Sequence, residues 1–235
     1  MDPALEPRIG VRLGPLVFGP RRFTAPALRA PEVGPLDLLL LTHAHMDHLD
    51  LGTLRQLPRE TPVVIPTGLR DLVRRFRDVT ELRWGERWTR GGTTVTLVPT
   101  RHWGARTVWD RHRGWGGYLM ERRTQAGEVR LLFAGDTAET DLLDPLAAHD
   151  LDVAVLPIGA YDPWIWNHCS PEQAWALHRR LGARWLLPVH HDTFRLSNEP
   201  ADEPRRRLLA AAGADAPRSV ALTEIGQSFT LPPRD

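Results

Sequence analysis

The chain contains no lysine and only one cysteine, Cys169, among its 235 residues. A single cysteine excludes an internal disulfide, and with it the small disulfide-stapled folds. Arginine therefore supplies all 30 Lys+Arg residues, against 29 Asp+Glu, and the formal net charge is +1. A charge so close to zero creates no overall field that would attract a nucleic acid or a membrane. We therefore expect no nucleic-acid partner.

Long apolar runs are also missing. No run approaches the roughly 20 residues that a membrane-spanning helix needs, and the first ten residues lack the apolar stretch of a signal peptide. These absences predict a cytoplasmic protein without a membrane segment. A hydrophobic content of 42% in a chain of this length suffices for one substantial core, so we expect a single domain over residues 1–235.

The most informative stretch follows a run of four leucines and has the sequence T-H-A-H-M-D-H-L-D at 42–50. His43 and His45 lie two residues apart in an extended segment, so their side chains project to the same side and can share one metal ion. Asp47 and His48 are offset from this pair and suit a second ion nearby. Imidazole and carboxylate ligands together favour zinc or a similar divalent metal.

Three further ligand candidates follow apolar, strand-like segments. His102 comes after an alternating β-branched segment, Asp136 sits in a Gly-Asp turn after an apolar one, and His190 ends a third. Loops at strand ends converge on one rim of a sheet, which is where binding residues gather. Four strand ends that all carry ligand-type residues are hard to obtain by chance, so we expect them to form one site.

Together these motifs resemble the metallo-β-lactamase superfamily of di-metal hydrolases, and most closely its N-acyl-phosphatidylethanolamine phospholipase D branch with the bacterial relatives of that branch. The similarity covers nearly the whole chain. It implies an α/β fold, an αββα sandwich of two mixed sheets with outer helices and the metals at one edge. The residues that carry it are the 42–50 motif, His102-Trp103, Trp115-Gly116-Gly117, the Gly135-Asp136-Thr137 turn, Leu156 to Tyr161, His168 with Pro171 to Ala174, and His190 with Thr193-Phe194 and Asn198-Glu199.

The resemblance also implies two divalent ions, Zn2+ in the first place, with Mn2+ or Fe2+ as alternatives. Seven residues would hold them: one ion by His43, His45 and His102, the other by Asp47, His48 and His190, with Asp136 bridging both. Two such ions can share a water and lower its pKa towards neutrality, so that a bridging hydroxide is the nucleophile. Asp47 and Asp136, as ligands of the ions, and His168 are the expected catalytic residues.

Five positions besides the seven ligands are of interest. By the resemblance, His168 lies near the substrate and could donate to a phosphoryl oxygen or to the leaving group, with a purely structural hydrogen bond as the alternative. Thr42 and Asp50 are expected either to orient a ligating histidine or to cap their loop. Tyr161, in the aromatic loop before His168, and His191 are candidate substrate contacts, although His191 suits a turn equally well.

These residues predict a hydrolase for a phosphodiester or a related phosphorylated small molecule, which could be lipid-like. A lactonase or other acyl hydrolase would use the same fold and the same nucleophile, so the fold alone does not decide between them. A metal-binding relative without catalysis is a third alternative. Zinc stoichiometry combined with turnover of a generic diester would separate this relative from an enzyme.

The resemblance is incomplete at the start of the chain. The family opens with a β-hairpin that ends at a Thr-Asp-Pro segment, and this sequence begins with Met1-Asp2-Pro3. We therefore expect the sandwich to lack that first hairpin and to have an exposed sheet edge, which proteins normally cover. A homo-oligomer would be one way to cover it.

Alternating strand-like and helix-like segments fill the rest of the chain. A capped helix is predicted over 170–181, with Ser170 as N-cap and Gly182 after its end. His149 and His178 are interpreted as helix-surface histidines. Further helices are expected at 51–57, 67–76, 140–148 and 204–212, and strands at 36–41, 62–65, 79–82, 93–98, 117–121, 129–133, 153–156, 185–187, 219–222 and 228–231.

Overall fold

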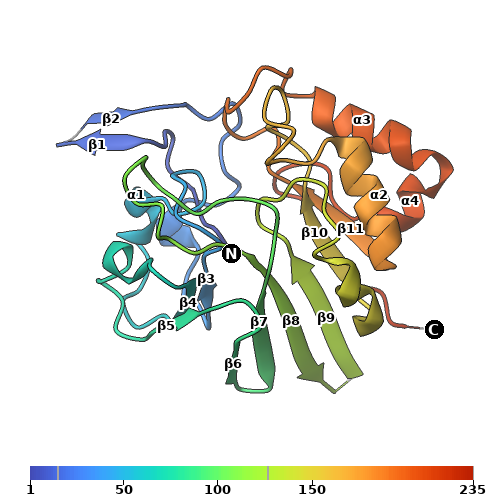
Figure 1. Ribbon diagram of the computed structural model, residues 1–235, viewed down its shortest axis with the longest axis horizontal. Helices are drawn as coiled ribbons and strands as arrows, with labels where there is room; N and C mark the ends of the chain where they lie inside the picture. The colour runs from blue at the N-terminus through green and yellow to red at the C-terminus, as the bar shows by residue number, and fades with distance from the viewer. Residues whose placement is uncertain (15, 126, 235) are drawn as a thin grey trace.

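The larger of two facing sheets has six strands in the order β11-β10-β9-β8-β7-β6. β9, β10 and β11 run parallel, whereas β6 to β9 pair antiparallel, so this sheet is mixed, as predicted. The computed structural model describes residues 1–14, 16–125 and 127–234 (Figure 1). The six strands are β6 (Arg87–Arg90), β7 (Thr93–Val98), β8 (Gly117–Thr124), β9 (Gly127–Phe133), β10 (Val153–Pro157) and β11 (Trp185–Val189).

The smaller sheet has three strands, β3 (Leu39–Leu40), β4 (Val63–Pro66) and β5 (Val79–Leu82), and all of them run parallel. The sequence predicted a mixed sheet here. The strands are parallel because each connection crosses back to the start of the next strand. The first connection contains α1 (Leu51–Leu54), and the second contains the 3-10 turn η2 (Arg70–Leu72).

Helix α2 (Pro171–Leu181) covers the outer face of the six-stranded sheet, and α3 (Glu203–Ala212) packs beside it (Figure 1). α2 confirms the helix predicted over 170–181: Ser170 and Gln173 form a capping box, and Gly182 ends the helix with a φ of 63°. The remaining helical segments are short, namely η1 (Ala30–Glu32), η3 (Asp144–His149), η4 (Gly213–Asp215) and α4 (Ala216–Ser219).

Two predicted helices form only short 3-10 turns. The segment 67–76 contains η2, because Gly68 takes a φ of 84° and donates its backbone N–H to the Glu81 carboxylate. In the segment 140–148 the turn η3 begins only at Asp144.

The strands predicted at 219–222 and 228–231 are wrong. α4 ends at Ser219, and Val220 makes a single bridge to Leu186 in β11. The second segment is irregular, although Phe229 packs against Trp185 with ring centroids 4.9 Å apart. The C-terminal residues therefore lie against β11 through isolated contacts and do not add a strand to its sheet.

The two sheets meet in a core cluster that fixes the end of β3. Leu40 and Val64 of the smaller sheet pack against residues of β7 and β8. Tyr118 of β8 is fully buried, and its hydroxyl donates to the carbonyls of Leu41, at 2.8 Å, and Val64, at 3.2 Å. Because Leu41 directly precedes the 42–50 motif, this contact positions that motif against the larger sheet.

A hairpin of β1 (Val11–Leu13) and β2 (Leu16–Phe18), which the sequence did not indicate, projects from the body of the molecule (Figure 1). Its strands pair with each other and form a sheet of their own. The first residues of the chain run beside β3 instead, where Asp2 donates its backbone N–H to the Leu40 carbonyl. This contact brings the Asp2 side chain to the C-terminal end of β3.

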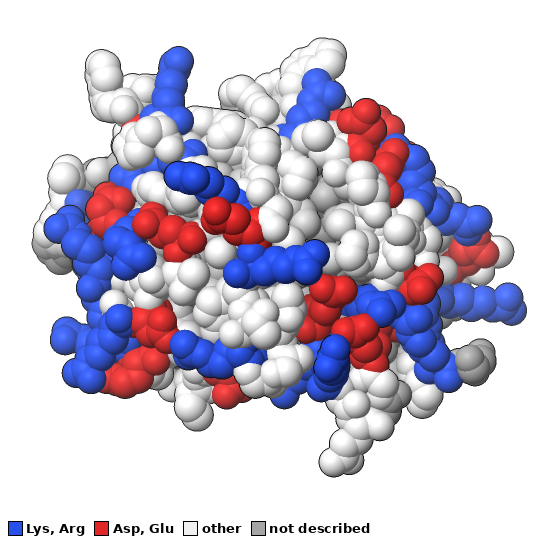
Figure 2. All heavy atoms as spheres, turned by 60° about the horizontal axis from the view of Figure 1, so that its bottom comes forward, with Lys and Arg blue, Asp and Glu red and all other residues white. Residues whose placement is uncertain are grey.

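Arginines and acidic side chains alternate over the face shown in Figure 2. Exposed ion pairs of the described residues include Arg90 with Asp78 and Arg180 with Asp144. Exposed pairs of this kind contribute little to stability because water and salt screen them. Within the described ranges, no helix is long and apolar enough to cross a bilayer.

Candidate metal centre

Four loops at one edge of the sandwich bring the predicted ligands together. β3 leads towards His43, β7 towards His102, β9 towards Asp136 and β11 into His190. β7, β9 and β11 run in the same direction, so their C-terminal ends meet at one edge. The seven predicted ligands form two groups, and both groups contain Asp136. Within each group, the donor atoms all lie within 4.8 Å of one another.

The first group consists of His43, His45, His102 and Asp136. His45 Nδ1 lies 2.9 Å from His43 Nε2 and 3.2 Å from His102 Nε2. Asp136 Oδ2 lies 3.7 Å from the Nε2 atoms of both His43 and His102. Tetrahedral ligands of a zinc ion, each about 2.0–2.1 Å from the metal, are about 3.3–3.4 Å apart. The observed separations therefore fit one ion.

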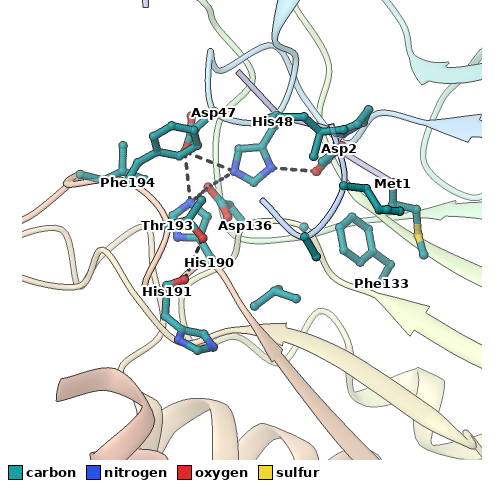
Figure 3. A pocket seen from close by; sticks show the side chains of 18 of the residues that line it. Met1, Asp2, Asp47, His48, Phe133, Asp136, His190, His191, Thr193 and Phe194 are labelled. Carbon is teal, nitrogen blue, oxygen red and sulfur yellow. Dashed lines mark hydrogen bonds and ion pairs between the residues drawn. The ribbon is translucent and has the colours of Figure 1, made fainter. Parts of the chain in front are cut away.

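The second group consists of Asp47, His48, His190 and Asp136. Asp47 Oδ2 lies 3.2 Å from His190 Nε2 and 3.5 Å from His48 Nε2. Asp136 Oδ2 lies 3.1 Å from His48 Nε2 and 3.5 Å from His190 Nε2 (Figure 3). The same carboxylate oxygen thus faces both groups, which is the position that a bridging ligand requires.

The protonation states in the site suit cations. Burial lowers the pKa of His43 well below its usual value and that of His102 to about 3, so both imidazoles stay neutral and keep a lone pair. Burial raises the pKa values of Asp47 and Asp136, but the surrounding histidines outweigh it and hold both well below the usual range. Among the described residues, Asp136 Oδ1 is buried without a hydrogen bond. Buried, ionised carboxylates beside the neutral imidazoles of His43 and His102 fit divalent ions.

His48 and His190 differ from the other histidines of the site. Burial lowers their pKa values, but Asp136 and Asp47 outweigh burial and raise both above the usual value. The two histidines therefore hold protons that compensate the carboxylates. A divalent ion would supply this positive charge in place of the protons and leave both imidazoles free to act as ligands.

Asp2 orients His48, although the sequence did not single it out as a site residue. Its Oδ2 lies 2.8 Å from His48 Nδ1, and its carboxylate accepts from the backbone N–H and the hydroxyl of Thr42, at 2.8 and 2.6 Å. A proton held on Nδ1 leaves Nε2 free for a metal. Thr42 Oγ1 also lies 2.9 Å from His43 Nδ1, which is the kind of contact predicted for it. The Asp-Pro pair at the start of the chain suggested a family motif, but not this contact across the sequence.

Two ligands depend on unusual backbone conformations. His190 has a φ of 61°, in the left-handed region that residues with a side chain rarely occupy. Gly135, directly before Asp136, has a φ of 61° as well. A Cβ atom at Gly135 would lie 2.8 Å from the Cβ and Cγ2 atoms of Thr42. The Gly-Asp turn therefore needs glycine both for its conformation and for its close approach to Thr42.

His168 lies in the site, on the loop before α2. Its ring stacks on His190 with centroids 5.2 Å apart and meets His102 edge-on at 5.1 Å. Its Nδ1 atom lies 3.8 Å from Asp136 Oδ2 and, within the described ranges, is buried without a hydrogen bond. Burial lowers the pKa of His168 to about 4, so the ring is neutral at pH 7 and can donate one N–H to a bound group.

Three other candidates belong to neither donor group, and their contacts differ. Asp50 caps α1 by accepting from backbone N–H groups of the first turn of this helix. Of the two alternatives for Asp50, these contacts fit capping and not the orientation of a ligating histidine. Tyr161 donates its hydroxyl to Glu203 at the start of α3. His191 lines a cavity beside His190 and belongs to neither donor group.

Apolar groups surround this polar centre. A cavity of about 500 Å³ adjoins the second donor group, and Met1, Phe133 and Phe194 lie in its wall (Figure 3). Tryptophans are exposed on the loops that carry His102 and His168. The exposed fractions are 47% for Trp103, 51% for Trp164 and 73% for Trp166.

The sandwich and its His/Asp site at one edge define the class of proteins with the metallo-β-lactamase fold. Within this class, the family model for the β-lactamase superfamily domain matches residues 2–191, and the chain belongs to that family. The family predicted from the 42–50 motif and the other strand ends is thereby confirmed.

Known relatives share the sequence or the fold. The chain is similar to N-acyl-phosphatidylethanolamine-hydrolyzing phospholipase D 1 of Caenorhabditis elegans, with 30% identity covering 81% of this chain and 58% of that protein. It is also similar to a metal-dependent hydrolase of Methanoculleus marisnigri, with 28% identity covering 84% and 83%. The isothiocyanate hydrolase from Delia radicum gut bacteria shares the fold, with a TM-score of 0.73 over 98% of this chain and 91% of that chain, at 16% identity.

The chain spans little more than half the length of the first curated relatives it matches, 55% and 58% in two of them. The sequence similarity therefore assigns the domain family. It does not transfer the activity, substrate or partners of the longer proteins.

Proposed function

We propose that the chain is a hydrolase that uses two divalent metal ions, Zn2+ in the first place, to cleave a phosphodiester in a small molecule with an apolar part. The observation that carries this proposal is the pair of donor groups that share Asp136 Oδ2. When bound, two divalent ions polarise a phosphoryl oxygen and supply a nucleophile from water at neutral pH. A nucleophilic side chain is then not needed, and Cys169, a free buried thiol, lies outside both donor groups.

The protein side chains would prepare this chemistry by their placement. Asp136 faces both donor groups through one oxygen, and Asp2 holds a proton on the far side of His48. His168 stands beside both groups, and its Nδ1 atom has no hydrogen-bond partner among the described residues. A neutral imidazole in this place can donate a hydrogen bond to a phosphoryl oxygen as negative charge develops on it.

The choice of a diester with an apolar part has two supports. The relative from Caenorhabditis elegans is named for hydrolysis of N-acyl-phosphatidylethanolamine by a phospholipase D activity. In this chain, the apolar cavity adjoins Asp136 and His190, and Trp103 contacts His45 edge-on at 4.5 Å. An uncharged substituent on the substrate would find apolar surface on either side of the metal ligands.

Metal content and turnover together test the proposal. Protein stripped with a chelator and reloaded with Zn2+, Mn2+ or Fe2+ would be assayed by elemental analysis and with bis-p-nitrophenyl phosphate. We expect two ions for each chain and chelator-sensitive release of p-nitrophenol. His43→Ala and Asp136→Ala should lose bound metal and fall to background turnover, because each removes a donor from a buried site.

His149→Ala is the matched control, because that histidine is half-exposed at the end of η3 and contacts Glu121 outside the site. It should keep both metal and turnover. Wild-type protein that binds two ions but hydrolyses only lactones or simple acyl esters would replace the diester with an acyl substrate. Two bound ions without hydrolysis of any ester would show a binding protein instead of an enzyme.

A further inference from the structure

A single arginine joins the two loops that supply the three histidines of the first donor group. The ligand loop (residues 43–49) follows β3, and the loop with His102 follows β7. Arg106, on the second of these loops, donates from Nη1 to the Ala44 carbonyl at 3.0 Å and to the Leu49 carbonyl at 2.8 Å. The side chain thus spans nearly the whole ligand loop from outside it.

The ligand loop has few hydrogen bonds of its own that could hold its ends. The His45 carbonyl accepts from the backbone N–H groups of His48, at 3.2 Å, and Leu49, at 2.8 Å, and these bonds close one turn in its middle. Ala44 and Leu49 are fully buried. Buried carbonyls need donors, since an unpaired one costs free energy comparable to a lost hydrogen bond. The Arg106 guanidinium supplies a donor to both.

Arg106 can hold the ligand loop because its own segment is anchored on both sides. His102 Nδ1 lies 3.1 Å from the Asn167 carbonyl. On the other side, Arg113 is buried and forms a two-pronged ion pair with Asp71, at 2.6 and 2.9 Å. The guanidinium of Arg106 therefore extends from a fixed support towards the ligand loop.

We propose that Arg106 is a positioning residue that sets the geometry of the metal centre by holding the ligand loop at a fixed distance from His102. A guanidinium offers no lone pair, so it does not act as a ligand. The proposal rests on the metal centre of the proposed function but is independent of the substrate. Hydrogen-bond partners of this kind typically change metal affinity by about 10- to 100-fold when they are removed.

If only the charge of Arg106 mattered, its removal would strengthen metal binding instead of weakening it. Arg106 lies near enough to Asp47 and Asp50 to interact with both carboxylates. A positive charge in this place opposes the binding of divalent cations. If charge were the main effect of Arg106, a neutral replacement would tighten metal binding, whereas loss of positioning would weaken it.

The test compares Arg106→Met and Arg106→Lys with Arg111→Met. Arg111 is exposed on the same loop, and the described residues offer it no hydrogen bond or ion pair, so its replacement removes the same charge without a contact. Metal affinity would be measured by competition with a chromophoric chelator, and ligand geometry by the d–d absorption of the Co2+-loaded proteins. We expect Arg106→Met to bind metal about 10- to 100-fold more weakly with altered Co2+ bands, and Arg111→Met to match the wild type.

Arg106→Lys keeps the charge and part of the donor capacity, and should lie between Arg106→Met and the wild type. If Arg106→Met does not fold, the comparison of Arg106→Lys with the wild type decides, because weaker metal binding with unchanged charge still supports positioning. Equal or tighter metal binding with unchanged Co2+ bands in the folded variants would overturn the proposal. A wild-type protein that binds no metal would instead remove the proposed function on which it rests.

Discussion

At the scale of single residues, the candidate ligands are oriented by side chains that lie far from them in the sequence. Asp2 contacts Thr42 and His48, and Arg106 contacts both ends of the ligand loop. Between them, the two residues form hydrogen bonds to backbone groups and to a ring nitrogen that would not themselves bind a metal ion. The spacing of histidines within the loop determines which of them can share an ion, whereas these distant contacts determine where the loop lies.

Gly135→Ala should damage the site although it changes no ligand. The residue has a φ of 61°, and the new Cβ would lie 2.8 Å from Thr42 Cβ. Strain in the left-handed region and the steric clash together should lower the free energy of unfolding by about 1–3 kcal/mol. Metal affinity should fall as well, because Asp136 must move with its neighbour. Thermal unfolding and a metal titration would measure both effects.

Gly91→Ala separates the two causes. Gly91 has a φ of 56° in the turn between β6 and β7, and beyond its two chain neighbours no described residue has an atom within 4 Å of the position that its Cβ would take. This variant should lose stability through backbone strain of about 1–2 kcal/mol and bind metal normally. If Gly135→Ala matched it in stability and in metal affinity, the close contact with Thr42 would have no importance.

At the scale of elements, the sequence predicts best where several local signals agree. α2 has an N-cap, a proline in its first turn, an apolar face and a glycine after its end, and its predicted range is confirmed. β7 is rich in β-branched residues, with the sequence T-T-V-T-L-V, and also lies where predicted, at 93–98. The ligands follow such strands directly, so the same signals located the strand ends that bring the donor atoms together.

The errors occur where a contact from another element decides. Gly68 interrupts the helix predicted at 67–76 with a positive φ and a bond to Glu81. Asp2 and Arg106 have no recognisable spacing to the residues that they contact, because those contacts exist only once the sheets have packed. Local periodicity carries no information on such pairs.

His178 illustrates a signal that was present but misread. The sequence placed it on the helix surface, yet positions 174, 177, 178 and 181 form one stripe of α2 and are buried. His178 is only 3% exposed and packs on Trp175 with ring centroids 5.1 Å apart. Burial lowers the pKa of His178 to about 4, so it is neutral in the folded protein at pH 7.

This burial predicts a loss of stability in mild acid. Unfolding restores the usual pKa of His178, about 6.5, so the unfolded chain binds a proton at His178 more readily than the folded chain does. The contribution of neutral His178 to the free energy of unfolding is complete above about pH 6.5. It is lost as the pH falls from about 6.5 to about 4, by up to about 3 kcal/mol. His178→Gln should remove this part of the slope in urea unfolding of chelator-treated protein.

His149→Gln is the comparison, because His149 is half-exposed and lies on η3. It should retain the wild-type pH slope between 6.5 and 4. Ionisable groups of the metal site contribute equally to all three proteins and cancel in the differences. Parallel slopes for the wild type and His178→Gln would show that His178 is accessible to protons in the folded state.

At the scale of the whole molecule, the two donor groups connect both sheets. The ligand loop follows β3 of the smaller sheet, whereas His102, Asp136 and His190 follow strands of the larger sheet. Tyr118 and its apolar neighbours hold the sheets together below the site. Ions bound at this edge would therefore tie together parts of the chain that separate when the protein unfolds.

Removal of metal should consequently lower the Tm of the whole domain. An ion that binds only the folded chain adds about 2.7 kcal/mol when its free concentration is 100 times the Kd. For a chain of this length, 1 kcal/mol corresponds to roughly 2–4 °C, so a chelator should lower the Tm by about 5–10 °C for each ion lost. Asp136→Ala should show no such response, because its missing carboxylate belongs to both groups. A wild-type Tm that is identical with and without chelator would mean that the four loops hold their positions through protein contacts alone.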